Sequence, residues 1–457
     1  MTIEPEPQDD LGDFRLRDDS VFEHGDNGGG EAPLIFFDLS RLLSRAKRPN
    51  ASGIDRVELA YARYLLATAR HRLVFTAINR WGDIAALPLE AMEKFVAALD
   101  SLWRGATEPL HARQTALAQA RYAQIYLHVN GARALRRAVE RWRGNIVYVL
   151  VSHHHLNRTA AIERLKRETG ASFVCFVHDT IPVDHPELSR PTQVWRHRQR
   201  LWTVAHLADF VIVNSAATKQ AFEQSFTDRR LCPILTAPLG VEKQFTGFRN
   251  AASGEHPYFV CVSTIEPKKN QMLLLNVWKK LRAELGSGTP HLLLIGRRKR
   301  MDNGVVREIK RSSELRGIVS KFDFLPDRDV ARLTVGANAA LLPSLAEGYG
   351  LAVAEALALG VPTLCSDLPA LREVGRGVPE YLNPRDELSW HDAILEYARA
   401  DSRRRQSQLT RLLAWRAPRW DDHFALVRPL LDGQPPLPTP NFVEPLFTPA
   451  PIAIEHV

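Results

Sequence analysis

Short apolar runs alternate with longer segments of helical periodicity along most of the chain. In the amino-terminal half, the apolar runs occupy residues 34–40, 73–79, 145–152, 172–177 and 209–215. Runs of this length are typical of strands that are buried on both faces of a parallel sheet. The segments between them are long enough to form crossover helices. The alternation therefore predicts an α/β domain built on a mostly parallel sheet.

The same alternation restarts after a loop of small residues at 251–254. Two αβ series predict two Rossmann-like domains facing across a cleft, and 457 residues are enough for both. We expect four parts: a disordered acidic tail, an amino-terminal domain, a carboxy-terminal domain and a proline-rich extended tail. Their expected ranges are 1–31, 32–245, 246–430 and 431–457.

Residues 341–367 are the most informative stretch and read as strand, turn, helix and strand. Gly348 and Gly350 flank Tyr349 in a turn that larger side chains would crowd. A helix of small residues begins at Leu351. In an open parallel sheet, ligands bind beyond the carboxyl ends of the strands, which is where this turn lies. The free N–H groups around Gly350 and Leu351 point into the same space and suit an anionic phosphate.

Two carboxylates belong to this unit, Glu347 before the helix and Glu355 within it. A carboxylate accepts hydrogen bonds from hydroxyls such as those of ribose or a hexose. Carboxylates beside phosphate-binding amides indicate a nucleotide sugar. On spacing alone, a plain βαβ unit with two solvated glutamates explains the pattern equally well.

The stretch resembles the carboxy-terminal signature of retaining glycosyltransferases of family 4, which have the GT-B fold. The signature is a glutamate in an E-G-[FY]-G-L turn, seven residues and a second glutamate, and residues 347–355 match it. The resemblance implies that Glu355 holds the ribose hydroxyls. It also implies that Glu347 holds sugar hydroxyls and helps to position the anomeric carbon. The remaining donor-binding residues of the turn would be Gly348, Tyr349, Gly350 and Leu351.

A histidine follows the expected strand at 172–177. His178 opens an H-D-x-x-P loop that resembles one found in many family-4 enzymes, whose histidine contacts the donor sugar from the opposite domain. A structural role is the alternative for a single histidine. Gly53 lies in the first strand–loop–helix unit, and the resemblance places it at the interdomain cleft near the donor. Asp55 and Arg56 beside it could instead cap and decorate the following helix.

Two lysines lie on the first loop of the second series. Pro267 fixes a turn, and Lys268 and Lys269 follow it. Their ammonium groups suit a diphosphate, both for binding and for the charge of the leaving group. In the resembling family this loop carries an arginine and a lysine. Lys269 matches the lysine, whereas Thr264 occupies the arginine position, so either Lys268 or Arg297 substitutes for that arginine or the contact is absent.

Two patterns that resemble metal sites are better explained without a metal. His153, His154 and His155 follow a strand, where successive side chains point to opposite sides. Asp327 and Asp329 form a D-x-D pair, but Asp327 lies where a helix N-cap belongs. We therefore expect no metal.

Charge is unevenly distributed, although the formal total is only +8. Residues 1–31 hold ten acidic residues against two arginines, so the rest of the chain is strongly basic. A basic body suits anionic substrates, an anionic membrane surface or nucleic acid. The arginine-rich segment 133–143 could contact anionic lipid, but a solvated helix face explains it better. With no apolar run of about 18 residues and no signal-peptide pattern at the start, we expect a cytoplasmic protein.

These features together predict a retaining, metal-independent glycosyltransferase. It would move a hexose from a nucleoside-diphosphate sugar to a hydroxyl of a glycan or lipid-linked acceptor in cell-envelope polysaccharide or glycolipid biosynthesis. We favour a GDP-linked, mannose-like donor and no cofactor, and we leave open peripheral contact with the anionic inner face of the cytoplasmic membrane. The alternatives are a GT-B sugar epimerase or phosphorylase and a non-catalytic nucleotide-sugar binding protein. No nucleic-acid motif supports a nucleic-acid partner.

Overall fold

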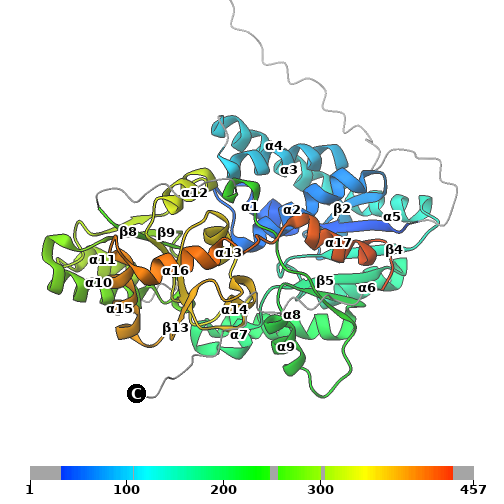
Figure 1. Cartoon of the computed structure of the whole chain (residues 1–457). Helices are drawn as coiled ribbons and strands as arrows, with labels where there is room; N and C mark the ends of the chain where they lie inside the picture. The colour runs from blue at the N-terminus through cyan, green and yellow to red at the C-terminus, as the bar shows by residue number, and fades with distance from the viewer. Residues whose placement is uncertain (1–31, 106–107, 247–255, 300–303, 436–457) are drawn as a thin grey trace, which may run out of the picture.

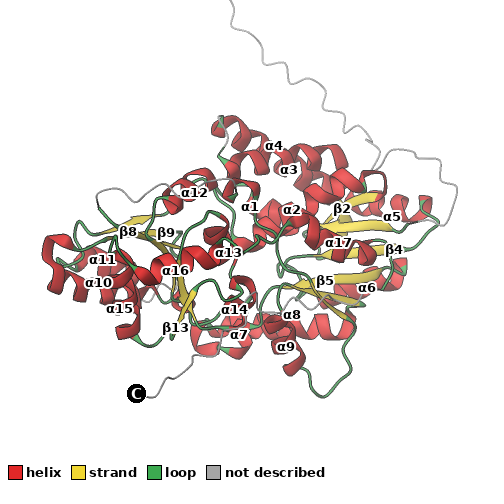
Figure 2. Ribbon diagram, in the orientation of Figure 1, coloured by secondary structure: helices red, strands yellow, loops and turns green. Residues whose placement is uncertain are grey.

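Two α/β domains lie side by side in the computed structural model (Figure 1), which describes residues 32–105, 108–246, 256–299 and 304–435. The predicted fold class and the presence of two Rossmann-like domains are confirmed, because each domain is organised around its own mostly parallel sheet (Figure 2). Apart from residues 431–435, the two expected tails lie outside the described residues.

The first domain contains a seven-stranded sheet in the order β3-β2-β1-β4-β5-β6-β7. Neighbouring strands are parallel except for β2 and β3, which form an antiparallel pair at one edge. The strands are β1 (Leu34–Asp38), β2 (Leu73–Ile78), β3 (Ile84–Ala86), β4 (Ile146–Leu150), β5 (Ser172–Val177), β6 (Phe210–Val213) and β7 (Ile234–Thr236).

The second domain contains a six-stranded sheet in the order β10-β9-β8-β11-β12-β13. All of its neighbouring strands are parallel. The strands are β8 (Tyr258–Val262), β9 (His291–Ile295), β10 (Val319–Phe322), β11 (Ala339–Leu342), β12 (Thr363–Ser366) and β13 (Glu380–Leu382).

Helices cover both faces of the sheets, so most strand residues are buried, although Ser320 on the edge strand β10 is exposed. In β1, Ile35 and Phe37 belong to one hydrophobic cluster and Leu34 and Phe36 to another, and all four are fully buried. The helices before β8 are α1 (Ser40–Arg45), α2 (Gly53–Thr68), α3 (Leu89–Arg104), α4 (Pro109–Val129), α5 (Gly131–Arg141), α6 (Thr159–Thr169), α7 (Ile181–Asp184), α8 (Pro191–Leu207) and α9 (Ala216–Gln224). Those after it are α10 (Gln271–Leu285), α11 (Val305–Arg311), α12 (Asp327–Val335), α13 (Leu351–Ala358), α14 (Pro369–Gly375), α15 (Glu387–Ala398), α16 (Arg403–Leu412) and α17 (Trp420–Leu431).

The last helix returns to the first domain, where α17 lies beside α2 (Figure 1). The Tyr61 hydroxyl and His423 Nε2 are 2.9 Å apart, and the Tyr64 and Phe424 rings stack with centroids 3.9 Å apart. Trp415, just before this helix, stays with the second domain because its indole N–H donates to the Val374 carbonyl at 3.1 Å. The chain therefore joins the domains twice, after β7 and before α17.

The loops after the strands of both sheets meet between the domains. Ser215, after β6, bonds to Gly348, after β11, and Asn50, before α2, bonds to Leu325, after β10. This arrangement places the expected binding loops of both domains at one interface.

Candidate functional site

The turn between β11 and α13 packs directly against the loop that follows β5. Gly350 caps α13 with φ of 101°, a conformation that favours glycine. A Cβ added to Gly348 would lie 2.2 Å from the His178 carbonyl oxygen. The glycines therefore allow the two predicted loops, one from each domain, to touch.

The first domain also holds this turn by hydrogen bonds. The Ser215 and Thr218 hydroxyls donate to the Gly348 carbonyl at 2.6 and 3.0 Å. The buried Tyr349 side chain donates from its hydroxyl to the Leu239 carbonyl at 2.8 Å, on the connection between the domains. Tyr349 thus fixes the turn in place rather than facing a ligand.

Glu347 and Lys269, which the sequence assigned to a single site, form a salt bridge. The Ser344 hydroxyl donates to the same Glu347 oxygen at 2.7 Å. Glu347 is only 9% exposed and Lys269 17%, so the pair is largely shielded from solvent. The lysine of the β8–α10 loop and the glutamate of the β11–α13 turn are therefore close enough to contact one ligand.

Lys268 lies among carboxylates of both domains. Burial acts to lower the pKa of its ammonium, but Asp179, Glu266 and Glu347 together raise that pKa above its ordinary value. The backbone carbonyl of Lys268 accepts a hydrogen bond from the Leu345 amide at 2.8 Å. Lys268 is thus a charged, positioned neighbour of the Glu347–Lys269 pair.

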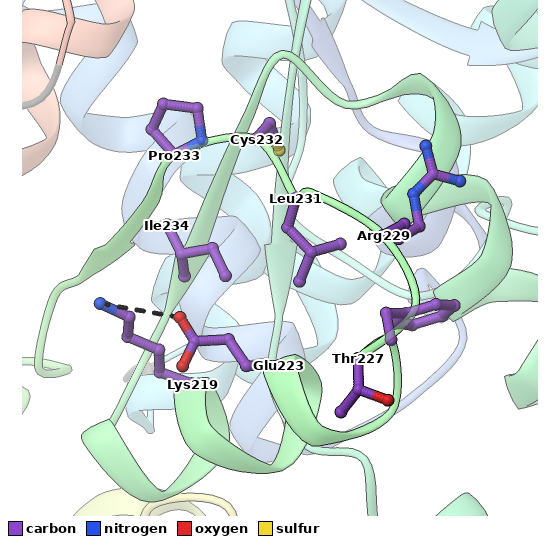
Figure 3. A pocket seen from close by; sticks show the side chains of 9 residues that line it. Lys219, Glu223, Thr227, Arg229, Leu231, Cys232, Pro233 and Ile234 are labelled. Atoms are coloured by element: carbon purple, nitrogen blue, oxygen red, sulfur yellow. Dashed lines mark ion pairs between the residues drawn. The ribbon is translucent and has the colours of Figure 1, made fainter.

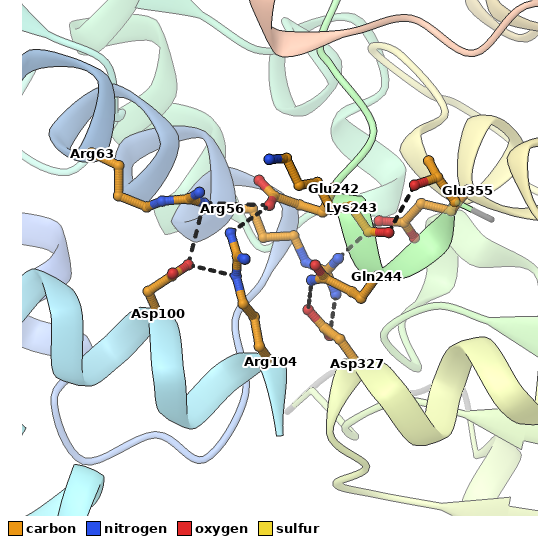
Figure 4. Close-up of polar contacts among 10 residues, drawn as sticks. Arg56, Arg63, Asp100, Arg104, Glu242, Lys243, Gln244, Asp327 and Glu355 are labelled. Carbon is orange, nitrogen blue, oxygen red and sulfur yellow. Dashed lines mark hydrogen bonds and ion pairs between the residues drawn. The ribbon is translucent and has the colours of Figure 1, made fainter. Parts of the chain in front are cut away.

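Glu355 is bound by an arginine of the first domain. Arg56, on α2, donates to Glu355 Oε1 at 2.8 Å and to Asp327 Oδ1 at 2.6 Å (Figure 4). Gln244 donates to the other Asp327 oxygen at 3.0 Å. The guanidinium lies 5.2 Å from the centre of the Phe245 ring. This Arg56 cluster links α2, the connection between the domains, and two helices of the second domain.

The charges in the Arg56 cluster oppose the effect of burial. Burial raises the pKa of the Glu355 carboxyl and Arg56 lowers it, and with Asp327 and Glu242 nearby the pKa is about 7. Burial lowers the pKa of Arg56, but Asp327 and Glu355 outweigh it and raise that pKa. Arg56 is thus held as a cation, while Glu355 exchanges a proton near neutral pH.

His178 lies in the wall of the first domain. Its Nε2 donates to the Val151 carbonyl at 2.7 Å, and its ring stacks on Phe176 with centroids 4.3 Å apart. Burial lowers the pKa of the imidazole to about 4, so the ring is neutral at pH 7. Val151 therefore fixes the tautomer, and the predicted contact of His178 with the sugar stays a prediction.

The other predicted residues are more scattered. Leu351 is half-buried at the start of α13, beside the Gly350 cap. Gly53 is exposed as the first residue of α2, and no atom lies within 4 Å of a Cβ added there. Arg297 is half-buried, and its charge acts on Arg45 and Arg48 of the first domain. The structure therefore brings Arg297 toward a different group of side chains from Lys269.

The sequence reasoning did not predict several side-chain contacts at the interface. Asp327 was expected as an N-cap, but Pro326 holds that position and the Asp327 carboxylate binds Arg56 instead. Arg56 was considered only as a helix surface residue. The Glu373 carboxylate accepts from the first two amides of α9, each at 2.7 Å, which is a further contact between the domains. The position of Arg56, a charged residue next to a predicted cleft loop, was the only signal in the sequence. Its partners lie about 300 positions away.

A hollow of about 420 Å³ lies at the edge of the first sheet, by α9 and β7 (Figure 3). Three charged side chains line it, Lys219, Glu223 and Arg229, and the first two lie 4.0 Å apart. Among the described residues, no group of three or more histidine, cysteine, aspartate or glutamate side chains could hold a metal ion. None of the helices in the described part of the chain has the length and hydrophobicity needed to span a bilayer.

Comparison with solved structures identifies the fold. Sucrose-phosphate synthase from Thermosynechococcus elongatus matches 88% of this chain and 98% of its own length, with a TM-score of 0.56 and 15% identity. Anabaena Alr3699/HepE in complex with UDP matches 87% of this chain and 99% of its own length, with a TM-score of 0.55 and 15% identity. The chain has the GT-B fold. At this identity the likeness concerns the fold alone.

Sequence comparisons point to the second domain of this GT-B chain. Residues 256–399 match the family model described as Glycosyl transferases group 1. The O-antigen chain mannosyltransferase B of Escherichia coli is 33% identical over 147 residues, which are 32% of this chain and 38% of that protein. The serotype-specific mannosyltransferase WbdA of Escherichia coli is 25% identical over 233 residues, 46% of this chain and 28% of that protein. The chain thus spans well under half the length of these relatives, and the matches support the predicted glycosyltransferase.

Proposed function

We propose that the chain is a retaining glycosyltransferase of family 4. It transfers a mannose-like hexose from a GDP-linked donor to an acceptor hydroxyl of a cell-envelope polysaccharide or glycolipid. The observation that carries this proposal is the joint placement of Glu347, Glu355 and Lys269 at the contact between the two domains. The names of the O-antigen mannosyltransferases support the choice of sugar and acceptor class.

The donor site follows from the contacts around Glu347. Lys269, with Lys268 beside it, binds the donor diphosphate, and the Leu351 amide faces the same group. The diphosphate competes with Glu347 for the Lys269 ammonium and so frees the Glu347 carboxylate to accept hydrogen bonds from sugar hydroxyls. Arg297 approaches the diphosphate from the side of the first-domain arginines. His178 contacts the sugar from the opposite domain.

The nucleoside lies toward the Arg56 cluster. Glu355 accepts hydrogen bonds from the two ribose hydroxyls, and Arg56 holds the carboxylate in place through Oε1. Gly53, at the start of the helix that carries Arg56, borders the same part of the cleft.

The reaction proceeds on one face of the sugar. The acceptor oxygen attacks the anomeric carbon from the side on which the diphosphate departs, the bond from that carbon to the diphosphate oxygen breaks, and the hydroxyl proton passes to the departing diphosphate. Lys269 and Lys268 stabilise the negative charge that develops on the diphosphate, which is the charge that fixed cations stabilise best. The configuration at the anomeric carbon is retained. No metal and no cofactor enters this scheme.

The reaction takes place in the cytoplasm, at the inner membrane face if the acceptor is lipid-linked. The α5 helix carries the arginine-rich segment, and its Arg133 and Arg136 are exposed. These side chains are suited to peripheral contact with an anionic bilayer.

Transfer from GDP-mannose to a glycan acceptor tests the proposal. Removing one charge-stabilising group typically lowers kcat by about 100- to 1,000-fold, and we expect that loss for Lys269→Ala. Lys280→Ala is the matched control, because Lys280 also pairs with a glutamate, Glu387, at 2.8 Å, but on the surface of α10. Activity of Lys269→Ala within threefold of the control would refute the diphosphate role. Release of free sugar without any acceptor would refute the transfer reaction.

A further inference from the structure

Cations gather on the first-domain side of the interface, on the segments that follow β1 and β4 and on α8. We call this group the basic wall. It consists of Arg41 and Arg45 on α1, Arg48 just after it, and Arg200 on α8, together with His154 after β4, whose imidazole is neutral at pH 7 because burial and the nearby arginines lower its pKa to about 3. All five side chains are half-buried, and they come from loops at the carboxyl ends of parallel strands or from the helix after them. This edge of a parallel sheet is where ligands bind.

The basic wall holds more positive charge than its carboxylates balance. Asp55 is fully buried and lies 2.6 Å from Arg41 Nε and 3.4 Å from Arg45 Nε, so one carboxylate serves two guanidiniums. The Arg48 and Arg200 side chains form no hydrogen bond or ion pair with another described residue, and Arg200 Nε is buried without a partner. Two guanidiniums are therefore left without an ion-pair partner among the described residues.

The cations of the basic wall act on one another. Burial lowers the pKa of Arg48 to about 10, and the nearby charges of Arg45 and Arg297 lower it in the same direction, while Asp55 opposes them. Burial, Arg196 and Arg41 likewise lower the pKa of Arg200, which only Asp179 opposes. Burial together with like charges disfavours the protonated form of a base. An anion bound among these groups would remove that cost.

The lysines of the β8–α10 loop, in contrast, have carboxylates beside them. Lys268 has Asp179, Glu266 and Glu347 close by, and their charges raise its pKa. Lys269 is paired with Glu347. Lys268 and Lys269 are therefore balanced before any ligand binds, whereas Arg48 and Arg200 have no ion-pair partner in the described part of the chain.

We propose that the basic wall binds a phosphate or diphosphate group of the acceptor substrate, with Arg48 and Arg200 as its main ligands. The identification of the ligand as the acceptor substrate rests on the proposed function, whereas the anion site itself does not. A guanidinium donates two parallel hydrogen bonds to phosphate oxygens, a geometry that suits the two unpaired arginines. Arg41 is already fixed by Asp55 and Ser52, and its charge acts on both Arg48 and Arg200.

Binding of inorganic pyrophosphate to the full chain, measured by calorimetry with GDP at saturation, tests the site. GDP occupies the donor site, so the remaining binding reports the basic wall. Loss of one hydrogen-bonded charge contact weakens binding about tenfold to a hundredfold, and we expect this for Arg48→Gln and for Arg200→Gln. Arg198→Gln, an exposed position on the same helix, should bind as the parent does. Absence of pyrophosphate binding, or equal binding by all four proteins, would overturn the proposal.

Two further measurements distinguish an anion site from a purely structural role of these arginines and from the donor site. Without added anions, Arg48→Gln and Arg200→Gln should melt at or above the parent temperature, since each removes an uncompensated charge. A lower melting temperature for both would indicate a structural role and refute the site. Lys269→Ala should keep its pyrophosphate binding at the basic wall, so failure of the donor assignment and failure of this site give different results.

The phosphate group could belong to a soluble phosphate ester or to a lipid-linked diphosphate. Competition against pyrophosphate by vesicles that carry a polyprenyl diphosphate, but not by neutral-lipid vesicles, would support the site with a lipid-linked acceptor. Competition by a hexose 6-phosphate alone would support it with a soluble acceptor. Competition by neither, in a protein that binds pyrophosphate, would limit the site to the inorganic anion and overturn its assignment to the acceptor.

Discussion

Arg56 is the best point at which to test the contact between the two domains. Its side chain is 15% exposed, and its partners Asp327 and Glu355 are 8% and 9% exposed. Replacing it with methionine keeps most of the volume and removes the charge, so two largely buried carboxylates lose their cation. Removing one member of a buried ion pair costs about 3–5 kcal/mol, because the remaining charge stays buried without a partner.

The expected value for Arg56→Met is near the lower end of that range. Glu355, with a pKa of about 7, can take up a proton and so avoid part of the cost, which leaves Asp327 with most of it. Loss of the contact with Phe245 adds about 0.5–2 kcal/mol. We therefore expect a loss of about 3 kcal/mol in the free energy of unfolding, measured by urea denaturation at pH 8, where Glu355 is mostly ionised.

The matched control is Arg63→Met, on the same helix. Arg63 is 36% exposed and lies 3.2 Å from Asp100 and 3.5 Å from Glu242, so its loss should cost less than about 1 kcal/mol. A second check is the double variant Arg56→Met with Glu355→Gln, which should recover part of the loss because one stranded carboxylate is gone. The reasoning is wrong if Arg56→Met costs no more than Arg63→Met, or if the double variant shows no recovery.

Three further predictions concern a buried carboxyl, a glycine contact and the nucleotide. Burial raises the pKa of the fully buried Glu58 from 4.5 to about 8, so the protonated side chain stabilises the fold fully below pH 4.5 and this stabilisation is lost as the pH rises to 8. Glu58→Gln should therefore raise the free energy of unfolding by about 3 kcal/mol at pH 7 and leave it unchanged at pH 4. Equal gains at both pH values would contradict this. Gly348→Ala places a Cβ 2.2 Å from the His178 carbonyl oxygen and should lower the free energy of unfolding by about 1–3 kcal/mol, with loss of much of the transfer activity. The control is Gly288→Ala, where no atom lies within 4 Å of the added Cβ and little stability should be lost. Similar melting temperatures for both variants would argue against the close contact. GDP at about 100 times its Kd should stabilise the folded chain by about 2.7 kcal/mol in a thermal melt. UDP, ADP and CMP at the same concentration should change the melting temperature little. A larger shift with UDP would reject the GDP-linked donor.

The sequence predicted individual loops of the site more reliably than their partners. Glu347 and Lys269 were assigned to one site because each follows a strand that ends at the same edge of a parallel sheet, and the structure pairs them. Tyr349 was grouped with them as a donor-binding residue, but it bonds to Leu239 on the connection between the domains. Adjacent residues in one turn point in different directions, and the sequence pattern does not say which of them faces a ligand.

Most contacts between the two domains could not be predicted from the sequence. Arg56 and Glu355 are separated by 299 positions, and nothing in either local pattern indicates that they meet. The contact of Asp327 with Arg56 was not predicted either, because local spacing favoured Asp327 as an N-cap. Trp415 packs on the second domain, although α17, a few residues later, packs on the first. The contacts of Arg56 with Glu355 and Asp327 depend on how the two domains are oriented.

The sequence by itself determined the two parallel sheets and the loops at their carboxyl ends, because apolar periodicity, glycine turns and helix boundaries depend on neighbouring residues. Only the tertiary structure decided which charges compensate one another. It pairs Lys269 with Glu347 and Arg56 with Glu355, whereas Arg48 and Arg200, in the first domain, have no ion-pair partner among the described residues. Electrostatic energy depends on distance in space and on exclusion of water, and both are fixed only when the two domains come together.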